Sequence, residues 1–377
     1  MALLNYIAIL GRQPEFGLVE LESLVGTDGV EEFGRHGAIL DQELEIDRLG
    51  GILKIGKILY RGPETTLRDL PIELADLPMR ETKTPFAIST YGFRETPKML
   101  MAAGLELKKR LRERGSVRLV TAARGLAATA AELRHNRVLE DGFELLVVSS
   151  GNEMVVARTS GVQNIDWYSR RDYDRPARSA KIGMLPPKLA QILVNTTKAG
   201  IVIDPFCGTG VILQEARLLG RASYGSDLAP EMVAATRLNM PWLDQEVAKQ
   251  LPDWDVQAGD AREIVLPEGC AVVTEGYLGP NMQHSPTRDQ LNPVRGDLLV
   301  MYKDSLRNWA GQLPAGAEVS MCVPVWRIGR EWHYLGLIDE LADLGYTPKS
   351  FRAVRTPLLY ARADQVVGRQ LLLLRKN

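Results

Sequence analysis

Hydrophobic positions in the first part of the chain follow two periodicities, those of a strand and of a helix. Residues 3–10 are almost uniformly apolar, which predicts a buried strand, whereas Leu18, Leu21 and Leu24 recur on one face of a predicted helix over residues 14–24. Up to about residue 160 this mixture predicts an α+β region. Its other expected elements are strands at 37–40, 86–91, 117–121, 130–134 and 143–148, a short amphipathic segment at 53–60 and a long helix at 97–114.

From Gly200 onward, short apolar strands alternate with amphipathic helices. Such alternation predicts a mostly parallel sheet covered by helices, closed here by an antiparallel pair of strands near the end of the chain. The expected strands are 201–204, 222–226, 255–258, 271–274, 319–324, 351–360 and 370–375, and the expected helices are 187–197, 210–219, 230–239, 295–313 and 334–344.

Composition narrows the class of protein without identifying it. The chain has 377 residues, 45% hydrophobic and 25% charged, as in soluble globular proteins of more than one domain. No apolar run reaches the roughly 20 residues of a membrane-spanning helix, and the start lacks the basic residues of a signal peptide. Cys207, Cys270 and Cys322 lack the spacing of a disulfide framework or a metal site, so we expect a cytoplasmic protein without metal.

The net charge of −1 conceals a basic middle segment. Residues 98–137 hold ten basic and three acidic residues, whereas the first fifty residues hold ten carboxylates and three arginines. Because phosphate contacts depend on local charge, the middle segment is a candidate nucleic-acid surface, although a solvated helix face explains it equally well. Its basic residues are Lys98, Lys108, Lys109, Arg110, Arg112, Arg114, Arg118, Arg124, Arg134 and Arg137.

The most specific local pattern is Asp204-Pro205-Phe206-Cys207-Gly208-Thr209-Gly210, between a predicted strand and a predicted helix. Glycines at such a junction allow a tight turn and a close approach to a ligand, and ligands bind at the carboxyl ends of strands in open α/β sheets. The third glycine of the dinucleotide pattern G-x-G-x-x-G is missing, which disfavours NAD. S-adenosylmethionine has no pyrophosphate and does not require that glycine.

Two further acidic residues follow predicted strands. Asp227, with Leu228 beside it, ends the second strand of the α/β region and is placed to accept hydrogen bonds from ribose hydroxyls. Asp260, with Ala261, ends the third and is placed to accept one from an adenine amine, although a helix cap is an equal interpretation of Asp260. The predicted cofactor-binding residues are Asp204, Phe206, Gly208, Thr209, Gly210, Asp227, Leu228, Asp260 and Ala261.

With these residues in place, the chain resembles the THUMP-domain tRNA guanine-N2 methyltransferases. Residues 204–210 resemble the first methyltransferase motif of that family, and residues 10–15 resemble the start of its ferredoxin-like segment. Residues 105–111 with His135 and Asn136 resemble its THUMP domain, an RNA-binding module. Residues 175–178 and 184–190 resemble the start of its catalytic domain.

The resemblance implies a Rossmann-like methyltransferase domain, with a mostly parallel sheet and an antiparallel closing strand, preceded by an α+β ferredoxin-like and THUMP region. We expect a ferredoxin-like segment at 1–80, a THUMP-type domain at 81–160, a basic linker at 161–185 and the methyltransferase domain at 186–377. The resemblance further implies S-adenosylmethionine as cofactor and the guanosine N2 amine of tRNA as acceptor, with position 10 as the first site to test. No membrane partner is expected, and a monomer is favoured.

The fourth motif departs from the family pattern Asp-Pro-Pro-Tyr. Thr274, Glu275 and Gly276 replace its first three residues, and Tyr277 keeps the tyrosine. An exocyclic amine needs an acceptor for its protons, and an aromatic ring can stack on an extruded base. We therefore expect Glu275, on a segment loosened by Gly276, to accept the proton, with Tyr277 and Thr274 as further catalytic residues.

Two alternatives follow from the same residues. A methyltransferase could act on another exocyclic base amine in RNA or DNA, since the fourth motif is altered. A protein with this fold could also bind RNA without catalysing a reaction, which the missing Asp-Pro-Pro favours and the complete 204–210 pattern disfavours.

Overall fold

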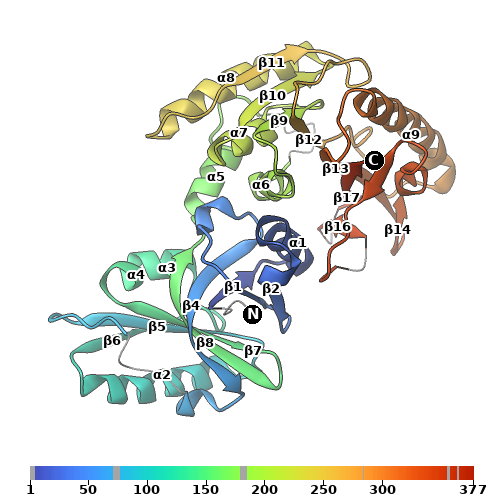
Figure 1. Ribbon diagram of the computed structural model, residues 1–377. Helices are drawn as coiled ribbons and strands as arrows, with labels where there is room; N and C mark the ends of the chain where they lie inside the picture. Colours follow the sequence, from blue (N-terminus) through green and yellow to red (C-terminus); the bar gives the residue numbers. More distant parts are fainter. Residues whose placement is uncertain (1–4, 71–76, 179–184, 283, 355–356, 363–364) are drawn as a thin grey trace. The chain divides into compact units, whose positions relative to one another are not determined.

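The computed structural model describes residues 5–70, 77–178, 185–282, 284–354, 357–362 and 365–377. Its contacts divide the chain into two compact units, Met1–Ile165 and Asp166–Asn377 (Figure 1). Each unit has its own sheet and its own apolar core. The finer division of the first unit into a ferredoxin-like segment and a THUMP-type domain stays a prediction.

Among the described residues of the first unit, one sheet of eight strands has the order β2-β3-β1-β4-β8-β7-β5-β6. Neighbouring strands are antiparallel except for β5, which pairs in parallel with both β6 and β7. The predicted α+β character is therefore present. The elements are β1 (Tyr6–Leu10), α1 (Pro14–Val25), β2 (Val30–Phe33), β3 (Gly37–Leu40), β4 (Ile52–Pro63), β5 (Thr84–Tyr91), α2 (Pro97–Arg112), β6 (Val117–Val120), α3 (Ala130–His135), α4 (Val138–Asp141), β7 (Phe143–Ser149) and β8 (Glu153–Val162), with 3-10 turns at Thr27–Gly29, Ile46–Arg48 and Leu67–Asp69.

One prediction for this unit needs correction, and one segment that had no predicted structure gains one. The strand expected at residues 130–134 is instead the helix α3. The Thr129 side chain accepts the Glu132 backbone N–H and the Glu132 carboxylate accepts the Thr129 backbone N–H, so a capping box starts this helix. The amphipathic segment expected at 53–60 is part of the long strand β4, which pairs with β1 on one side and with β8 on the other.

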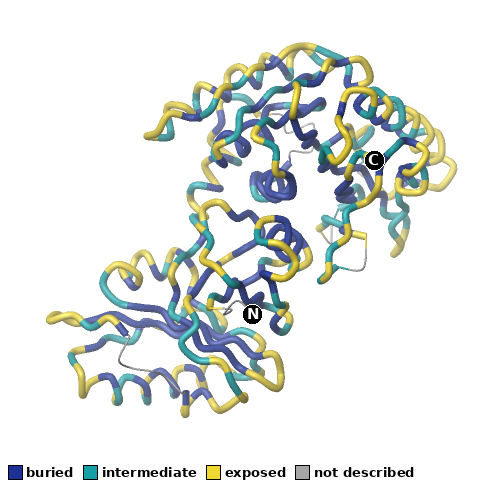
Figure 2. The backbone as a smooth tube through the Cα atoms, viewed as in Figure 1, coloured by how far each residue is buried: buried dark blue, intermediate teal, exposed yellow. Residues whose placement is uncertain are grey.

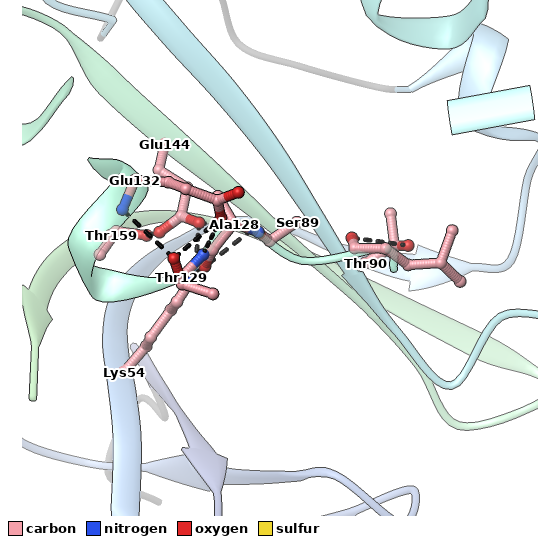
Figure 3. A network of polar contacts seen from close by, with 9 residues as sticks. Lys54, Ser89, Thr90, Ala128, Thr129, Glu132, Glu144 and Thr159 are labelled. Atoms are coloured by element: carbon pink, nitrogen blue, oxygen red, sulfur yellow. Dashed lines mark hydrogen bonds and ion pairs between the residues drawn. The ribbon is translucent and has the colours of Figure 1, made fainter. Parts of the chain in front are cut away.

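A buried ion pair crosses the first sheet. The Lys54 ammonium donates to the Glu144 carboxylate, and their side chains are 5% and 0% exposed. Figure 3 shows the groups that complete this network: Ser89 and Thr159 donate their hydroxyls to Glu144, and Lys54 also donates to the Ala128 carbonyl at 2.7 Å. A buried pair is costly unless its remaining hydrogen-bonding groups are satisfied, and here three neighbours satisfy them.

Among the described residues of the second unit, a nine-stranded sheet has the main order β11-β10-β9-β12-β13-β17-β15. The five strands from β11 to β13 run parallel, and β17 closes the sheet antiparallel to β13 and β15. The predicted parallel sheet with an antiparallel closing strand is confirmed. The strands are β9 (Ile201–Asp204), β10 (Ala222–Asp227), β11 (Trp254–Ala258), β12 (Cys270–Glu275), β13 (Glu318–Ile328), β14 (Glu331–Tyr334), β15 (Tyr346–Pro348), β16 (Leu358–Tyr360) and β17 (Val367–Lys376).

Helices cover this sheet on both sides. Helix α6 is buried along almost its whole length, whereas α8 keeps an exposed face (Figure 2). Helix α9 shares one apolar core with strands β9, β12, β13 and β17. The helices are α5 (Ile165–Tyr173), α6 (Pro187–Asn195), α7 (Val211–Leu218), α8 (Pro230–Glu246) and α9 (Arg288–Ala310), with a 3-10 turn at Leu337–Glu340.

Two predictions for this unit also need correction. Residues 334–344 are not a helix, because Gly336 and Gly345 adopt positive φ angles of 88° and 80° that interrupt helical geometry. Of the strand expected at 351–360, only Leu358–Tyr360 is a strand, and residues 355–356 lie outside the description. The linker expected at 161–185 stays a prediction: this range contains α5, and its residues 179–184 lie outside the described part of the chain.

Among the described residues, no helix combines the length and the apolar composition needed to cross a membrane. The same residues contain no cluster of three or more histidine, cysteine, aspartate or glutamate side chains suited to hold a metal ion.

Candidate functional site

The candidate site lies where four neighbouring parallel strands end. Strands β11, β10, β9 and β12 are adjacent in the sheet, so their carboxyl ends meet at one edge. Asp204 ends β9, Asp227 ends β10 and Glu275 ends β12, while Asp260 follows β11 by two residues. The sheet therefore brings these four carboxylates, which are far apart in the sequence, to the place where open α/β sheets bind ligands.

The β9 loop, residues 204–210, has a backbone that its glycines make possible. Gly208 and Gly210 have φ angles of 52° and 83°, a region that side chains disfavour. A Cβ atom on Gly210 would lie 2.9 Å from Thr236 of α8, whereas nothing lies within 4 Å of such an atom on Gly208. Gly210 thus permits the close packing of the loop, and Gly208 leaves open space beside it.

Asp227 joins the end of β10 to the β9 loop. One of its carboxylate oxygens accepts the Gly208 N–H and the other accepts the Ala229 N–H, both at 2.9 Å. Burial raises the pKa of Asp227, and the two backbone N–H donors oppose that rise. The Asp227 side chain is only partly buried, so its carboxylate can also accept hydroxyl donors of a ligand.

Asp204 and Thr274 join the β9 loop to strand β12. The Thr274 hydroxyl donates to Asp204 Oδ1 at 2.6 Å, and the Phe206 N–H donates to the same oxygen at 3.1 Å. Burial of the carboxyl, with smaller contributions from the charges of Asp227 and Glu275, raises the pKa of Asp204 to about 8. Both side chains are buried, so their contact fixes the two loops relative to each other.

The predicted adenine side of the site contains a mixture of free and engaged groups. The Asp260 carboxylate accepts the Arg262 guanidinium and the Arg262 backbone N–H, which lowers the pKa of Asp260. It therefore caps its own turn, the alternative that the sequence left open for it. Leu228, in contrast, is 71% exposed, unusual for a leucine between a strand and a helix, and Ala261 is buried.

The carboxylate of Glu275 is already engaged. It accepts the guanidinium of Arg369 from β17, and the two side chains are 14% and 5% exposed. Burial raises the pKa of Glu275, while the Arg369 charge works against that rise. Glu275 thus does not point freely toward a substrate, as the sequence had suggested it would.

Tyr277 and Gly276 are placed by a residue that the sequence did not single out. The Tyr302 hydroxyl of α9 donates to the Tyr277 carbonyl at 2.9 Å. A Cβ atom on Gly276 would lie 2.3 Å from the Tyr302 ring. The Tyr277 side chain itself is 51% exposed. Gly276 is therefore closely packed rather than loose, and the Tyr277 ring stays accessible.

Other groups around the site also escaped the sequence analysis. Asn239 of α8 donates to the Thr209 carbonyl and exchanges hydrogen bonds with the Ala177 backbone, all at 2.9 Å. Trp309 of α9 donates to the Ala261 carbonyl at 2.9 Å. The sequence signal near these contacts was the segment 175–178, which resembles the start of the catalytic domain of the methyltransferase family. The contacts themselves join residues that are distant in the sequence, and such contacts leave no local pattern.

Comparisons with known proteins agree on methyl transfer. A family model described as "DNA methylase" matches residues 177–237. A tRNA (guanine(10)-N2)-dimethyltransferase of Methanothermobacter thermautotrophicus is 30% identical over 191 residues, which cover 50% of each chain. A protein of the same name from Pyrococcus abyssi is 36% identical over 127 residues, 32% of this chain and 35% of that one. The matches thus span half or less of these relatives.

Two solved structures share the fold over nearly the whole chain. TrmN from Thermus thermophilus superimposes with a TM-score of 0.54 at 18% identity, covering 99% of both chains. A possible methylase from Clostridium difficile 630 gives 0.50 at 14% identity, covering 98% of this chain and 97% of the other. At these identities the likeness establishes the fold alone.

Proposed function

We propose that this protein transfers a methyl group from S-adenosylmethionine to the N2 amine of a guanosine in tRNA. The observation that carries the proposal is the strand-end site, in which Asp227 fixes the glycine-containing β9 loop while Thr274 links that loop to the altered fourth motif. The similarity of the chain to relatives named tRNA (guanine(10)-N2)-dimethyltransferase supports the N2 amine of guanosine as the acceptor, with position 10 of tRNA as the site to test.

The residues at the carboxyl edge of the sheet suit this cofactor. Asp227 is partly buried and its carboxylate accepts the Gly208 N–H, so ribose hydroxyls placed at the β9 loop can also donate to it. The exposed Leu228 offers an apolar surface to a purine ring. When bound, S-adenosylmethionine supplies an electrophilic methyl group on a sulfonium centre. The remaining predicted cofactor residues, Asp204, Phe206, Thr209, Gly210, Asp260 and Ala261, shape the same edge.

The chain's own groups must present the acceptor amine in line with that methyl. The amine lone pair is delocalised into the base, so an acceptor for its protons is needed to align it. We propose that the exposed Tyr277 ring stacks on the base and that the loop around Thr274 and Glu275 supplies the acceptor. Stacking of this kind contributes about 1–3 kcal/mol per base.

We place the tRNA-binding surface on the basic residues of the first unit, several of which are already engaged. Arg110 donates to the Leu70 carbonyl and Arg118 donates to Asn136, so their hydrogen-bonding groups are partly committed within the protein. Within the described part of the chain, Lys108 and Arg112 of α2 have no such partner. These two cations are better suited to contact phosphate.

A fixed loop adds to this surface. The Glu132 carboxylate accepts the Ala123 N–H at 2.7 Å, and the network around Lys54 holds both backbone groups of Ala128. Between these anchors Arg124 is exposed. A cation on a fixed backbone loses less entropy on binding than one on a flexible loop.

A salt titration tests this assignment. The variant Lys108→Gln/Arg112→Gln should lower the slope of log K against log salt by about 0.9 for each duplex phosphate contact that is lost. The matched control Arg110→Gln/Arg118→Gln removes the same charge from engaged positions and should change the slope less. Equal slopes in both variants would mean that the tRNA path lies elsewhere.

The activity itself is tested by nucleoside mass spectrometry. The protein is incubated with unmodified tRNA and methyl-labelled cofactor, and the digested RNA is searched for labelled N2-methylguanosine and N2-dimethylguanosine. Label on another base would identify that base as the acceptor instead, and calorimetric cofactor binding without label would favour an RNA-binding protein.

The free, buried cysteines agree with the reducing cytoplasm in which we place the protein.

The second candidate is methylation of an exocyclic amine in DNA. The family model described as "DNA methylase" favours it, because it matches residues 177–237 around the β9 loop. Single-stranded and duplex DNA incubated in parallel with the tRNA distinguish the two. Labelled adenine or cytosine in DNA, without label in tRNA, would establish the second candidate.

A further inference from the structure

The altered fourth motif lacks the rigidity that two prolines give. Proline fixes its own φ angle, whereas glycine is the most permissive residue. In this chain Glu275 and Gly276 occupy those positions. An acceptor that must lie within about 2.6–3.2 Å of the amine nitrogen requires a well-defined backbone. Some other part of the molecule must therefore hold residues 274–277, which we call the β12 loop.

Helix α9 provides a buried side chain at this place. Tyr302 is 0% exposed, and its hydroxyl donates to the Tyr277 carbonyl at 2.9 Å. Its ring fills the space where a side chain at position 276 would lie, with 2.3 Å to the ideal Cβ position. Gly276 does not have a positive φ angle, so the contact with Tyr302, and not backbone strain, is what requires a glycine there.

The same tyrosine reaches the cofactor side of the site. Its ring lies 6.2 Å from the Phe206 ring, centroid to centroid, and Phe206 belongs to the β9 loop. Burial keeps the pKa of Tyr302 well above its ordinary value, so its hydroxyl remains a donor at any physiological pH. From other strands, Arg369 holds the Glu275 carboxylate and the Cys322 carbonyl accepts the Gly276 N–H at 3.1 Å. The β12 loop is thus held from α9, β13 and β17.

We propose that Tyr302 is the positioning residue of the methyl-transfer site, replacing the two missing prolines. In this role it holds the β12 loop so that a backbone carbonyl, rather than the engaged carboxylate of Glu275, accepts a hydrogen bond from the target amine. As the bond from the amine nitrogen to the methyl group forms and the sulfur–methyl bond breaks, the amine proton is released to water. This inference rests on the proposed function for its substrate. The restraint of the loop by Tyr302 can be tested without that function.

The test compares Tyr302→Phe with Tyr346→Phe. Tyr346 is also buried in the second unit, and its hydroxyl also donates to a backbone carbonyl, that of Leu306, at 3.0 Å. Both variants lose one buried phenol hydrogen bond, so a similar loss of thermal stability is expected for both. Of these two tyrosines, Tyr302 is the one that contacts the β12 loop.

Two measurements are made on each full-length variant. Hydrogen–deuterium exchange should be faster in a peptide containing residues 274–280 in Tyr302→Phe and unchanged there in Tyr346→Phe. Single-turnover methylation of tRNA should be about fivefold slower or more in Tyr302→Phe, the effect of one lost hydrogen bond of about 1 kcal/mol. The dissociation constants for cofactor and tRNA should not change.

Each outcome decides a separate point. Unchanged exchange at residues 274–280 in Tyr302→Phe overturns the inference, whatever the activity. Faster exchange with a wild-type single-turnover rate, or an equal loss of rate in Tyr346→Phe, overturns the positioning role. A wild-type protein that methylates no substrate refutes the proposed function, and the exchange measurement then still decides whether Tyr302 holds the loop.

Discussion

The β9 loop and the β12 loop lie side by side at one edge of the sheet but are held in different ways. The β9 loop turns through its own glycines, Gly208 and Gly210, with positive φ angles. The β12 loop has no such angle and is held by side chains from other elements, above all Tyr302 and Arg369. One loop carries its geometry in its own residues, and the other receives it from residues that are distant in the sequence.

The largest effect is expected from breaking the ion pair of the β12 loop. Glu275→Gln leaves the Arg369 guanidinium buried without its carboxylate, which should lower the free energy of unfolding by about 3–5 kcal/mol. Urea denaturation measures this change. The control Glu246→Gln breaks the pair with Arg170, whose side chain is 52% exposed, and should cost about 1 kcal/mol or less. Equal stability of wild type and Glu275→Gln would contradict the buried pair.

Replacing one glycine of each loop by alanine should distinguish the two kinds of support. Gly276→Ala places a methyl group against Tyr302, and a displaced acceptor should slow single-turnover methylation by roughly 10²-fold, with cofactor affinity kept. Gly208→Ala meets no neighbour but is strained by about 1–2 kcal/mol at its positive φ angle, and should weaken cofactor binding instead. Rate measurements and calorimetry on both variants would show a slower reaction in Gly276→Ala and weaker cofactor binding in Gly208→Ala. The same defect in both variants would mean that the two loops are not supported in different ways.

The cofactor side of the comparison depends on Asp227. Asp227→Ala should weaken S-adenosylmethionine binding roughly tenfold or more, since charge-assisted hydrogen bonds contribute about 1.5–3 kcal/mol. Titration calorimetry measures the affinity. Asp260→Ala is the matched control, because Arg262 already engages that carboxylate and a smaller loss is expected. A folded Asp227→Ala variant that binds as tightly as wild type would refute the assignment.

The smallest effect, taken per pH unit, concerns the bond that joins the two loops. Asp204 has an ordinary pKa near 4 when unfolded and a pKa of about 8 in the structure, so the folded state holds its proton more tightly. Its stabilising contribution is complete below about pH 4 and is lost as pH rises toward 8, by at most about 1.4 kcal/mol per pH unit. The melting temperature should therefore fall as the pH is raised from 5 to 9.

The substitution Asp204→Asn tests that pH dependence. It should reduce the fall of the melting temperature with rising pH without abolishing it. Burial also raises the pKa values of Asp227 and Glu275, which lie at the same edge of the sheet. If the Asp204→Asn variant kept the same slope as wild type, Asp204 would have to be ionised in the folded protein.

The sequence was informative wherever a constraint is local. Alternation of apolar strands and helices after Gly200 predicted the parallel sheet, and the glycines of residues 204–210 marked its ligand-binding turn. It failed at Gly276, where a residue distant in the sequence decides the packing, because the Tyr302 ring lies against that glycine. At residues 130–134 the local capping box of Thr129 and Glu132 starts a helix, a signal that the strand prediction did not include.

By itself, then, the sequence determined the order of strands β9 to β13 along the chain, the turn after β9 and the acidic residues that follow these strands, because periodicity and glycine conformation act over a few residues. Only the tertiary structure decided which of those carboxylates are available. Asp227 accepts backbone N–H groups and is partly exposed, whereas Asp260 is engaged by Arg262 and Glu275 by Arg369. The partner of Glu275 lies on β17, 94 residues along the chain, and such a pairing exists only when the sheet has closed.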